Sequence, residues 1–300
     1  MYDVIIIGRG PAGLSAALYV VRAGQSALVV AQDDGQIAKA EKVDNYYGFS
    51  ETTSGPELQK NALAQARRLG VDFAEGTVTG IVWDDHFRVS SAEGEWEARA
   101  VILATGMPKR KSRLQGLDLY EGKGVSYCAT CDGFFYRGKT VGVIGNADYA
   151  LHEIHDLVPF AGSIFWLTNG RPVALSKPLV SLPDKTSIDE RPLAKVDGDG
   201  EVLREIVFED GCRTHVDGIF VAEGTASATD FALKLGIETA GNAIRTDRDG
   251  RTNLPGFFAA GDCTGGILQI SVAVGEGATA GLAAAKFVRE KKAEEKKAAT

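Results

Sequence analysis

Two cysteines three positions apart, Cys128 and Cys131, are the residues of this chain whose chemistry is most clearly indicated. At this spacing, at the start of a helix, two cysteines can close an exchangeable disulfide, and the helix N-terminus stabilises a thiolate. Asp132 follows directly and can shuttle the proton that thiol exchange requires. The string Cys-Ala-Thr-Cys-Asp therefore predicts a redox-active pair with Asp132 as its acid–base partner.

Two other interpretations of the pair are half of a zinc site and two buried structural cysteines. A structural zinc site needs four ligands, but the chain has no second Cys-x-x-Cys, and its four histidines show no ligand spacing. The redox interpretation is favoured, and no metal is expected. Cys212 follows an Asp-Gly turn and is interpreted as incidental. Cys263 follows Gly261-Asp262, and a small packing residue is favoured there over a third redox thiol.

The chain begins with a glycine-rich turn of the sequence Gly8-Arg9-Gly10-Pro11-Ala12-Gly13. It lies between an expected strand and an expected helix, which is the context a dinucleotide-binding turn requires. Gly8 permits the tight turn, Gly10 lets a pyrophosphate approach the backbone, and Gly13 allows close packing of helix on strand. The acid expected to bind the ribose is not identified, because Asp33 and Asp34 both lie just beyond the second strand.

A strand–turn–helix–strand pattern occurs twice, which predicts parallel sheets in an α/β fold. The first copy has strands at residues 4–7 and 27–30 around a helix at 14–21, and the second has strands at 141–144 and 163–167 around a helix at 149–157. Further strands are expected at 101–104 and 257–260, and a helix at 275–288. Residues 172–200 are expected to form loops and short strands.

The composition and the beginning of the chain limit the function classes. The net charge is −7 over 300 residues, and no basic cluster predicts nucleic-acid binding. No apolar run approaches the roughly 20 residues of a membrane span. Met1-Tyr2-Asp3 leads directly into a strand and lacks the features of a signal peptide. A cytoplasmic protein is expected, in which a close cysteine pair favours catalysis over a structural disulfide.

Six motifs together resemble the low-molecular-weight thioredoxin reductases, in family order and at family spacing from residue 4 to about residue 285. They are Gly8 to Gly13, Val43-Asp44-Asn45-Tyr46, Ala104-Thr105-Gly106, Cys128-Ala129-Thr130-Cys131-Asp132-Gly133, Ala259-Ala260-Gly261-Asp262 and Gly275-Glu276-Gly277.

The resemblance implies two Rossmann-like three-layer dinucleotide-binding domains, the second inserted in the first. It implies an FAD domain at 1–114 and 243–300, an inserted redox domain at 115–242, and a homodimer. Cys131 would face the flavin, and Cys128 would attack the disulfide of thioredoxin, the implied electron acceptor. The residues implied to bind FAD are Gly8, Gly10, Pro11, Ala12, Gly13, Gln36, Asn45, Ala104, Thr105, Gly106, Gly261, Asp262, Gln269 and Ile270.

The chain departs from the NADPH-using members of this family at its second turn, Gly145-Asn146-Ala147-Asp148-Tyr149. Only the first glycine of the fingerprint is kept, and Ala147 adds a Cβ where a pyrophosphate would approach. The His-Arg-Arg run that pairs with the 2′-phosphate of NADPH is replaced at residues 168–170 by Thr-Asn-Gly, before Arg171. NADPH is therefore not expected to be the reductant. Ferredoxin-dependent flavin thioredoxin reductases show this pattern, and ferredoxin or another protein is the expected donor.

Three functions follow from these observations. The favoured one is an FAD-dependent disulfide reductase acting on thioredoxin or a similar protein disulfide. The first alternative is a flavin dithiol oxidase that uses oxygen, but such relatives carry His where this chain has Asp132. The second is a redox-sensing flavoprotein without turnover. The second turn could also hold another nucleotide or flavin stacked on Tyr149 or Trp166, although packing is favoured for both side chains.

Overall fold

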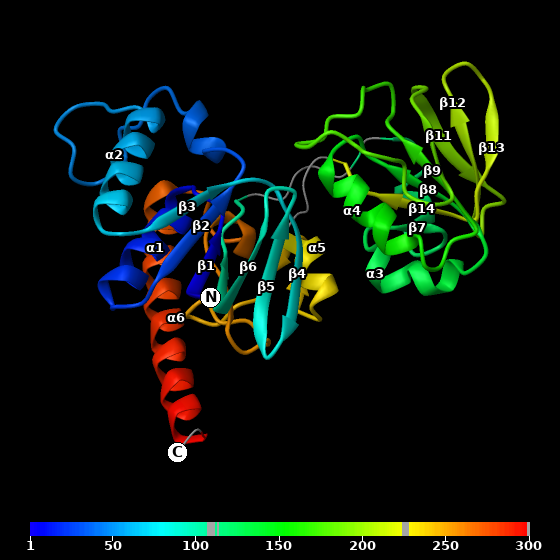
Figure 1. Cartoon of the computed structure of the whole chain (residues 1–300). Coiled ribbons are helices and arrows are strands. Elements are labelled where there is room, and N and C mark those ends of the chain that lie inside the picture. The colour runs from blue at the N-terminus through cyan, green and yellow to red at the C-terminus, as the bar shows by residue number, and fades with distance from the viewer. Residues whose placement is uncertain (107–111, 113, 224–227, 299–300) are drawn as a thin grey trace. The chain divides into compact units, whose positions relative to one another are not determined.

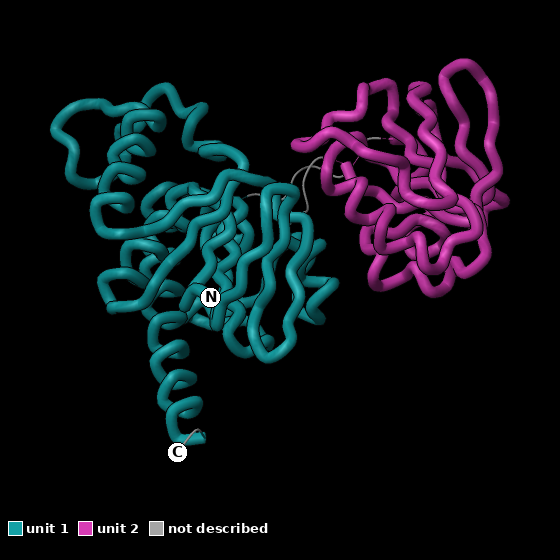
Figure 2. Tube along the Cα trace, in the orientation of Figure 1, with its two compact units in different colours: residues 1–108, 227–300 teal, residues 109–226 magenta. Residues whose placement is uncertain are grey.

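The computed structural model describes residues 1–106, 112, 114–223 and 228–298. The chain divides into two compact units, shown in teal and magenta in Figure 2. Unit 1 contains residues 1–108 and 227–300, and unit 2 contains residues 109–226. Unit 1 is thus built from both ends of the chain, and unit 2 from the segment between them.

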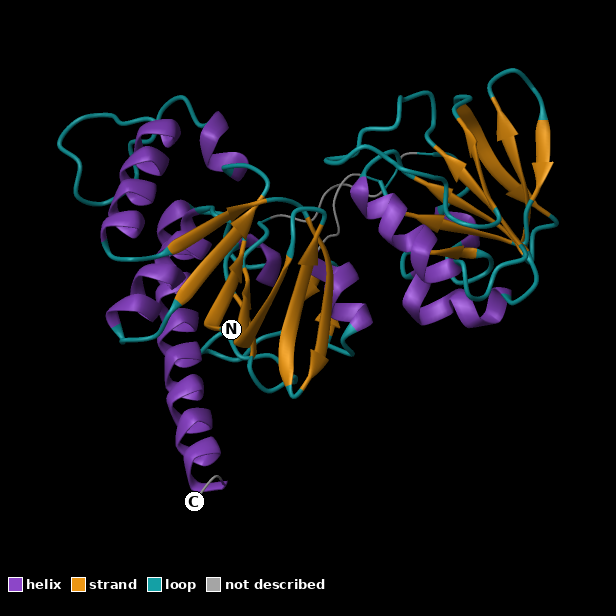
Figure 3. Cartoon of the chain, viewed as in Figure 1, coloured by secondary structure: helices purple, strands orange, loops and turns teal. Residues whose placement is uncertain are grey.

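The sheet of unit 1 places its parallel strands in the order β3 (Asp72–Glu75), β2 (Ala27–Ala31), β1 (Tyr2–Ile7), β6 (Glu95–Leu103) and β17 (Phe257–Ala259). The apolar run at residues 4–7 is buried throughout, as expected for a parallel strand covered on both faces. β6 also pairs antiparallel with β5 (His86–Ser91), which pairs with β4 (Val78–Asp84) (Figure 3).

The helices of unit 1 that position the first glycine-rich turn are α1 (Pro11–Arg22) and α6 (Ile270–Ala298), which pack against each other (Figure 1). A Cβ on Gly277 would lie 2.1 Å from the carbonyl oxygen of Ala12, and one on Gly281 would lie 2.5 Å from that of Ala16. Glycine in α6 therefore permits this close approach. The remaining α-helices and strands among the described residues of unit 1 are α2 (Gly55–Arg68), α5 (Ala228–Lys234), β15 (Thr239–Ala240) and β16 (Ala243–Ile244).

Unit 2 has a parallel sheet in the order β10 (Thr186–Asp189), β9 (Ser163–Leu167), β8 (Thr140–Ile144), β14 (Gly218–Val221) and β7 (Val125–Ser126). Helix α4 (Asp148–Leu157) contacts β8 and β9, and it also contacts the short α3 (Ala129–Asp132). A separate antiparallel sheet contains β11 (Leu193–Gly198), β12 (Leu203–Phe208) and β13 (Arg213–His215). The redox pair therefore lies where β7 leads into α3, beside α4.

The expectation of an α/β fold with two Rossmann-like units, one inserted in the other, is confirmed by this topology. The expected domain boundaries after residues 114 and 242 differ from the compact units, because α5 contacts β16 and both belong to unit 1. Helix α6 is longer than expected at both ends, beginning at Ile270 and ending at Ala298. None of the described helices combines the length and apolar character needed to cross a bilayer.

Candidate functional site

The two cysteines of the redox pair are joined by a disulfide with a Cα–Cα distance of 5.3 Å. Cys128 is buried, with 3% of its surface exposed, whereas Cys131 is exposed. The backbone N–H of Cys131 donates a hydrogen bond to the Sγ of Cys128 at 3.1 Å. A reagent therefore reaches the pair from the side of Cys131, and Cys128 has a donor in place that stabilises negative charge on its sulfur.

Asp132 is held next to the pair by Ser126, the last residue of β7. The Ser126 hydroxyl donates to Asp132 Oδ2 at 2.7 Å and accepts from the backbone N–H of Cys128 at 3.1 Å. One buried hydroxyl thus connects the acid to the backbone of the first cysteine. This geometry suits a carboxyl group that exchanges protons with the pair.

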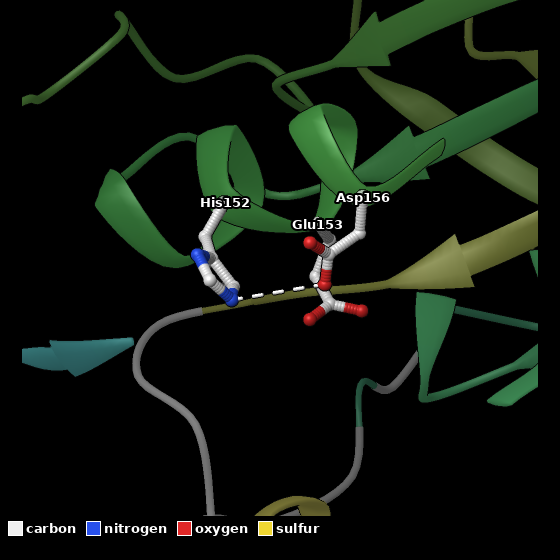
Figure 4. Close-up of side chains that lie close together, drawn as sticks. All are labelled: His152, Glu153 and Asp156. Atoms are coloured by element: carbon white, nitrogen blue, oxygen red, sulfur yellow. Dashed lines mark ion pairs between the residues drawn. The ribbon is translucent and has the colours of Figure 1, made fainter. Parts of the chain in front are cut away.

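Helix α4 supports the cysteine helix through two carboxylates. The buried Glu153 accepts a hydrogen bond from the backbone N–H of Ala129 at 2.7 Å, and Asp156 accepts from the hydroxyl of Thr130 at 2.8 Å. His152 Nε2 lies 3.7 Å from Asp156 Oδ2, as the dashed line in Figure 4 marks. Sequence reasoning missed all three residues, because the contact between α3 and α4 is a tertiary one.

These three side chains of α4 also bring possible metal ligands within 4.8 Å of one another, a grouping that the histidine spacing did not suggest. Glu153 and Asp156, however, already accept hydrogen bonds from α3. We therefore assign them to the support of the redox pair and assign no metal to the group.

The first glycine-rich turn has the shape that a pyrophosphate requires. A Cβ on Gly8 would lie 2.3 Å from the carbonyl oxygen of Ala104, and a Cβ on Gly13 would lie 1.9 Å from that of Gly8. A Cβ on Gly10, the N-cap of α1, would meet no atom within 4 Å. No side chain caps the start of α1, where Pro11 is the first helical residue. The N-terminus of α1 thus offers open space and backbone donors to an anion, which fits FAD.

The other predicted cofactor residues lie in unit 1, and several are in contact. Asn45 Nδ2 donates to Gln269 Oε1 at 2.9 Å. A Cβ on Gly261 would lie 2.8 Å from that of Ala12. The remaining predicted residues are Ala104, Thr105 and Gly106 after β6, Gln36 in a short 3-10 helix at Gly35–Lys39, Asp262 beside Gly261, and Ile270 at the start of α6.

Two charged residues of this region, Glu276 and Arg9, lie in the sequence motifs but were given no role there. Glu276 accepts from the Gly261 N–H at 2.8 Å and from the Thr264 hydroxyl at 3.1 Å. Burial, with a smaller effect of Glu276, raises the pKa of Asp262. Arg9 lies 2.6 Å from Asp34, so that acid already has a partner in the protein. Spacing within one motif does not report such pairings between distant segments.

The second glycine turn is paired with a later segment of the chain. Asn146 accepts from the Ala174 N–H at 2.7 Å and donates to the Pro172 carbonyl at 2.9 Å. Asp148, the first residue of α4, accepts from the Ser176 hydroxyl at 2.7 Å. The turn and the first residue of α4 therefore contact residues 172–176 through the carbonyl and side chain of Asn146 and the carboxylate of Asp148.

Cations and aromatic rings near this turn also have partners in the protein. Arg171 forms an ion pair with Glu223 at 3.1 Å, and the Asn169 side chain accepts from the Leu193 N–H at 2.9 Å. Trp166 is fully buried and donates from its indole nitrogen to the Gly145 carbonyl at 2.6 Å. Tyr149 is buried at 2% exposure. Trp166 and Tyr149 are thus core residues, which agrees with the prediction that both side chains serve packing.

The fold and the site define a two-unit flavoprotein scaffold with a disulfide centre, and comparison with known proteins agrees. Residues 2–156 and 187–277 match the family model described as pyridine nucleotide-disulphide oxidoreductase. The thioredoxin reductase of Listeria innocua is 36% identical and aligns over 97% of this chain and 95% of its own length.

Two solved structures are similar over nearly the whole chain. The atypical thioredoxin reductase TRi from Desulfovibrio vulgaris Hildenborough is 40% identical with a TM-score of 0.90, over 97% of this chain and 99% of the other. A ferredoxin-flavin thioredoxin reductase from Clostridium acetobutylicum is 30% identical with a TM-score of 0.70, over 96% and 98%.

The chain belongs to the pyridine nucleotide-disulphide oxidoreductase family, with thioredoxin reductases among its relatives. It is accordingly an oxidoreductase of a flavoprotein family whose cofactor is FAD.

Proposed function

We propose that this protein is an FAD-dependent disulfide reductase that reduces thioredoxin through Cys128 and Cys131, with electrons from a protein donor such as ferredoxin rather than from NADPH. The disulfide beside Asp132 is the observation that carries the activity. The pairing of the second glycine turn with residues 172–176 carries the choice of donor. Bound FAD would supply the electrons that reduce the disulfide, held at the first glycine turn and the N-terminus of α1.

The exposure of Cys131 and the hydrogen bond to Cys128 support the roles proposed for the two sulfurs. Cys131 is exposed and is the sulfur proposed to face the flavin, so that its reduction releases Cys128 as the thiolate. The Cys131 N–H, at 3.1 Å, stabilises that thiolate. Cys128 then attacks a thioredoxin sulfur, which breaks the thioredoxin disulfide and forms a mixed disulfide.

The Cys131 thiolate completes the exchange by attacking the Cys128 sulfur. The pair closes again, and thioredoxin leaves as a dithiol with two protons and two electrons gained. Asp132, fixed by Ser126, passes protons between the pair and the departing thiolates.

We propose that NADPH is not the donor because of the charges near the second glycine turn. The Asp148 carboxylate lies at the start of α4, where a phosphate would have to bind, and it repels such an anion. Arg171 is engaged by Glu223, and each charge-assisted contact missing from the 2′-phosphate removes roughly 1.5–3 kcal/mol of binding. A flavin accepts electrons singly, which suits a one-electron donor, and the iron–sulfur cluster would lie on the partner.

Anaerobic titration of the holoenzyme tests both parts of the proposal. We expect NADPH to leave the spectrum of the oxidised flavin unchanged, reduced ferredoxin to bleach it, and oxidised thioredoxin to restore it. Rapid bleaching by micromolar NADPH would overturn the choice of donor and leave the activity standing.

A cysteine variant tests the proposed roles of the pair. Cys128→Ser is expected to abolish thioredoxin reduction, whereas Cys212→Ser, at an exposed free cysteine, retains it. Thioredoxin turnover by the Cys128→Ser protein would refute the assigned mechanism. The proposed homodimer and the proposed cytoplasmic location are checked separately, by light scattering and by cell fractionation.

A further inference from the structure

The buried carboxylate of Glu153 is the feature of unit 2 that packing alone does not explain. Glu153 is 1% exposed, on the face of α4 that meets the cysteine helix. Glutamate is almost never fully buried unless it is paired, and an ionised carboxylate costs several kcal/mol to remove from water. A neutral glutamine would accept the same hydrogen bond at lower cost. The presence of a carboxyl group rather than an amide at this buried position therefore calls for a functional explanation.

We propose that Glu153 is a positioning residue whose negative charge sets the reduction equilibrium of the Cys128–Cys131 pair and makes the dithiol a stronger reductant. The inference rests on the proposed function, since a reductase needs a dithiol that gives up electrons readily. Glu153 acts through the backbone of α3 and through its field, and it touches neither sulfur in a reacting bond.

The geometry brings this charge to the first cysteine. Glu153 Oε2 lies 2.7 Å from the backbone nitrogen of Ala129, the amide that directly follows Cys128. Cys128 is itself buried, so water screens the charge less than it would at a surface. Figure 4 shows the carboxylates of Glu153 and Asp156 side by side, both on side chains of α4. The buried carboxyl group of Glu153 thus contacts the residue next to Cys128, whose sulfur is proposed to become a thiolate.

Reduction of the pair changes the charge next to Glu153. The disulfide takes up two electrons and one proton, the S–S bond breaks, and the products are the Cys128 thiolate and the Cys131 thiol. The neutral disulfide interacts weakly with a carboxylate, whereas the thiolate is repelled by it. Glu153 therefore stabilises the oxidised pair relative to the reduced one, which makes electron transfer onward to a substrate disulfide more favourable.

Glu153→Gln tests the proposal because it keeps a hydrogen-bond acceptor for the Ala129 N–H and removes the charge. The holoenzyme is equilibrated at pH 8 with glutathione buffers of stated ratio, acid-quenched and alkylated, and the reduced fraction of the pair is measured by peptide mass. The flavin is followed separately by its absorbance. We expect the equilibrium constant for reduction by glutathione to rise about tenfold, equal to about +30 mV for this two-electron couple.

Asp156→Asn is the matched control. It makes the same carboxylate-to-amide change on the same helix and keeps an acceptor for the Thr130 hydroxyl, but Asp156 is half-buried and better screened. Its equilibrium constant is expected to change less than twofold. An equal shift in both variants would contradict a specific role for Glu153.

An unchanged equilibrium in Glu153→Gln would overturn the proposal, since either a neutral Glu153 or a purely structural role gives that result. Glu153→Ala, which removes the acceptor as well, is expected to show at least the same shift. None of these measurements uses thioredoxin or the protein electron donor of the proposed function. Failure of the protein to reduce thioredoxin would therefore count against the proposed function while leaving the shift intact.

Discussion

Asn45 and Gln269, separated by 224 positions in the chain, are joined by a hydrogen bond of 2.9 Å between their side-chain amides. Both residues were singled out for FAD binding by resemblance alone. Their contact links the segment before α2 to the residue that precedes α6. The two ends of the chain thus meet at one of the positions proposed to hold the cofactor.

Removing either amide is expected to weaken flavin binding. Gln269→Ala takes away the acceptor of Asn45, and one exposed hydrogen bond contributes about 0.5–1.5 kcal/mol. We expect a severalfold faster loss of FAD on dilution, measured by the fluorescence of the released flavin. Gln65→Ala, at an exposed glutamine of α2, is the control and should behave as the unaltered protein.

The glycines of the first turn are expected to separate cofactor binding from folding. Gly10→Ala places its Cβ in open space, so the apoprotein should keep its melting temperature but lose FAD. Gly13→Ala forces its Cβ to within 1.9 Å of the Gly8 oxygen and should cost about 3 kcal/mol of stability. Thermal melts of both apoproteins, with flavin content, check this contrast. Normal FAD content in Gly10→Ala would argue against the assigned site.

Ser126→Ala removes the hydroxyl that donates to Asp132 and accepts from the Cys128 N–H. The acid loses its orientation while the cysteines remain, so we expect the rate of thioredoxin reduction to fall by about tenfold, within the range of general acid–base effects. Single-turnover kinetics of the reduced enzyme measure this. Ser126→Thr keeps the hydroxyl and should restore most of the rate, and failure of that rescue would point to packing instead.

The pairing of Asp3 with Lys292 makes stability depend on acid pH. Burial raises the pKa of Asp3, but hydrogen bonds from Lys292, at 2.7 Å, and from Ser26 outweigh it and hold that pKa below its ordinary value. Because the pKa of Asp3 is lower in the folded protein than in the unfolded chain, its ionised form stabilises the fold at pH values above the unfolded pKa of about 3.9. This stabilisation is lost as the pH falls through the lower pKa of the folded state.

Lys292→Met is therefore expected to lower the free energy of unfolding by about 1–2 kcal/mol near neutral pH and by much less below about pH 3. Urea unfolding at several pH values measures this. Lys291→Met, which removes only an exposed pair with Glu294, is the control and should cost little at any pH. A pH-independent loss would assign the effect to packing.

The two free cysteines are expected to differ sharply in reactivity. Cys263 is fully buried, and burial raises the pKa of its thiol to about 12, whereas Cys212 is exposed. Iodoacetamide added to the oxidised native protein should label Cys212 and spare Cys263, as read by peptide mass. Rapid labelling of Cys263 would revive its role as a third redox thiol.

The sequence predicted the local elements of this fold well, because their signals are local. The buried run at residues 4–7 and the glycines at 8, 10 and 13 determine a strand, a turn and a helix within a short stretch. The disulfide between Cys128 and Cys131 follows from spacing in the same way. Features of this kind need no knowledge of distant residues.

Contacts between distant segments were not predictable from one sequence. Glu153 lies 24 positions from Ala129, and Ser176 lies 28 positions from Asp148, and neither spacing belongs to any periodic pattern. The change at the second turn was visible, since Gly145 stands alone, but the segment that pairs with it was not. Likewise the grouping of α5 with unit 1 follows from its contact with β16, which the sequence alone does not show.

The packing of α6 on α1 has a consequence for synthesis on the ribosome. Helix α6, Ile270–Ala298, packs on α1, Pro11–Arg22, so unit 1 lacks a main packing partner until residues 270–298 have been made. Residues 109–226 emerge earlier and hold all their own sheet partners. Domains generally fold as units during translation. Unit 2 can therefore fold first, whereas α1 gains its packing partner only when α6 has been made.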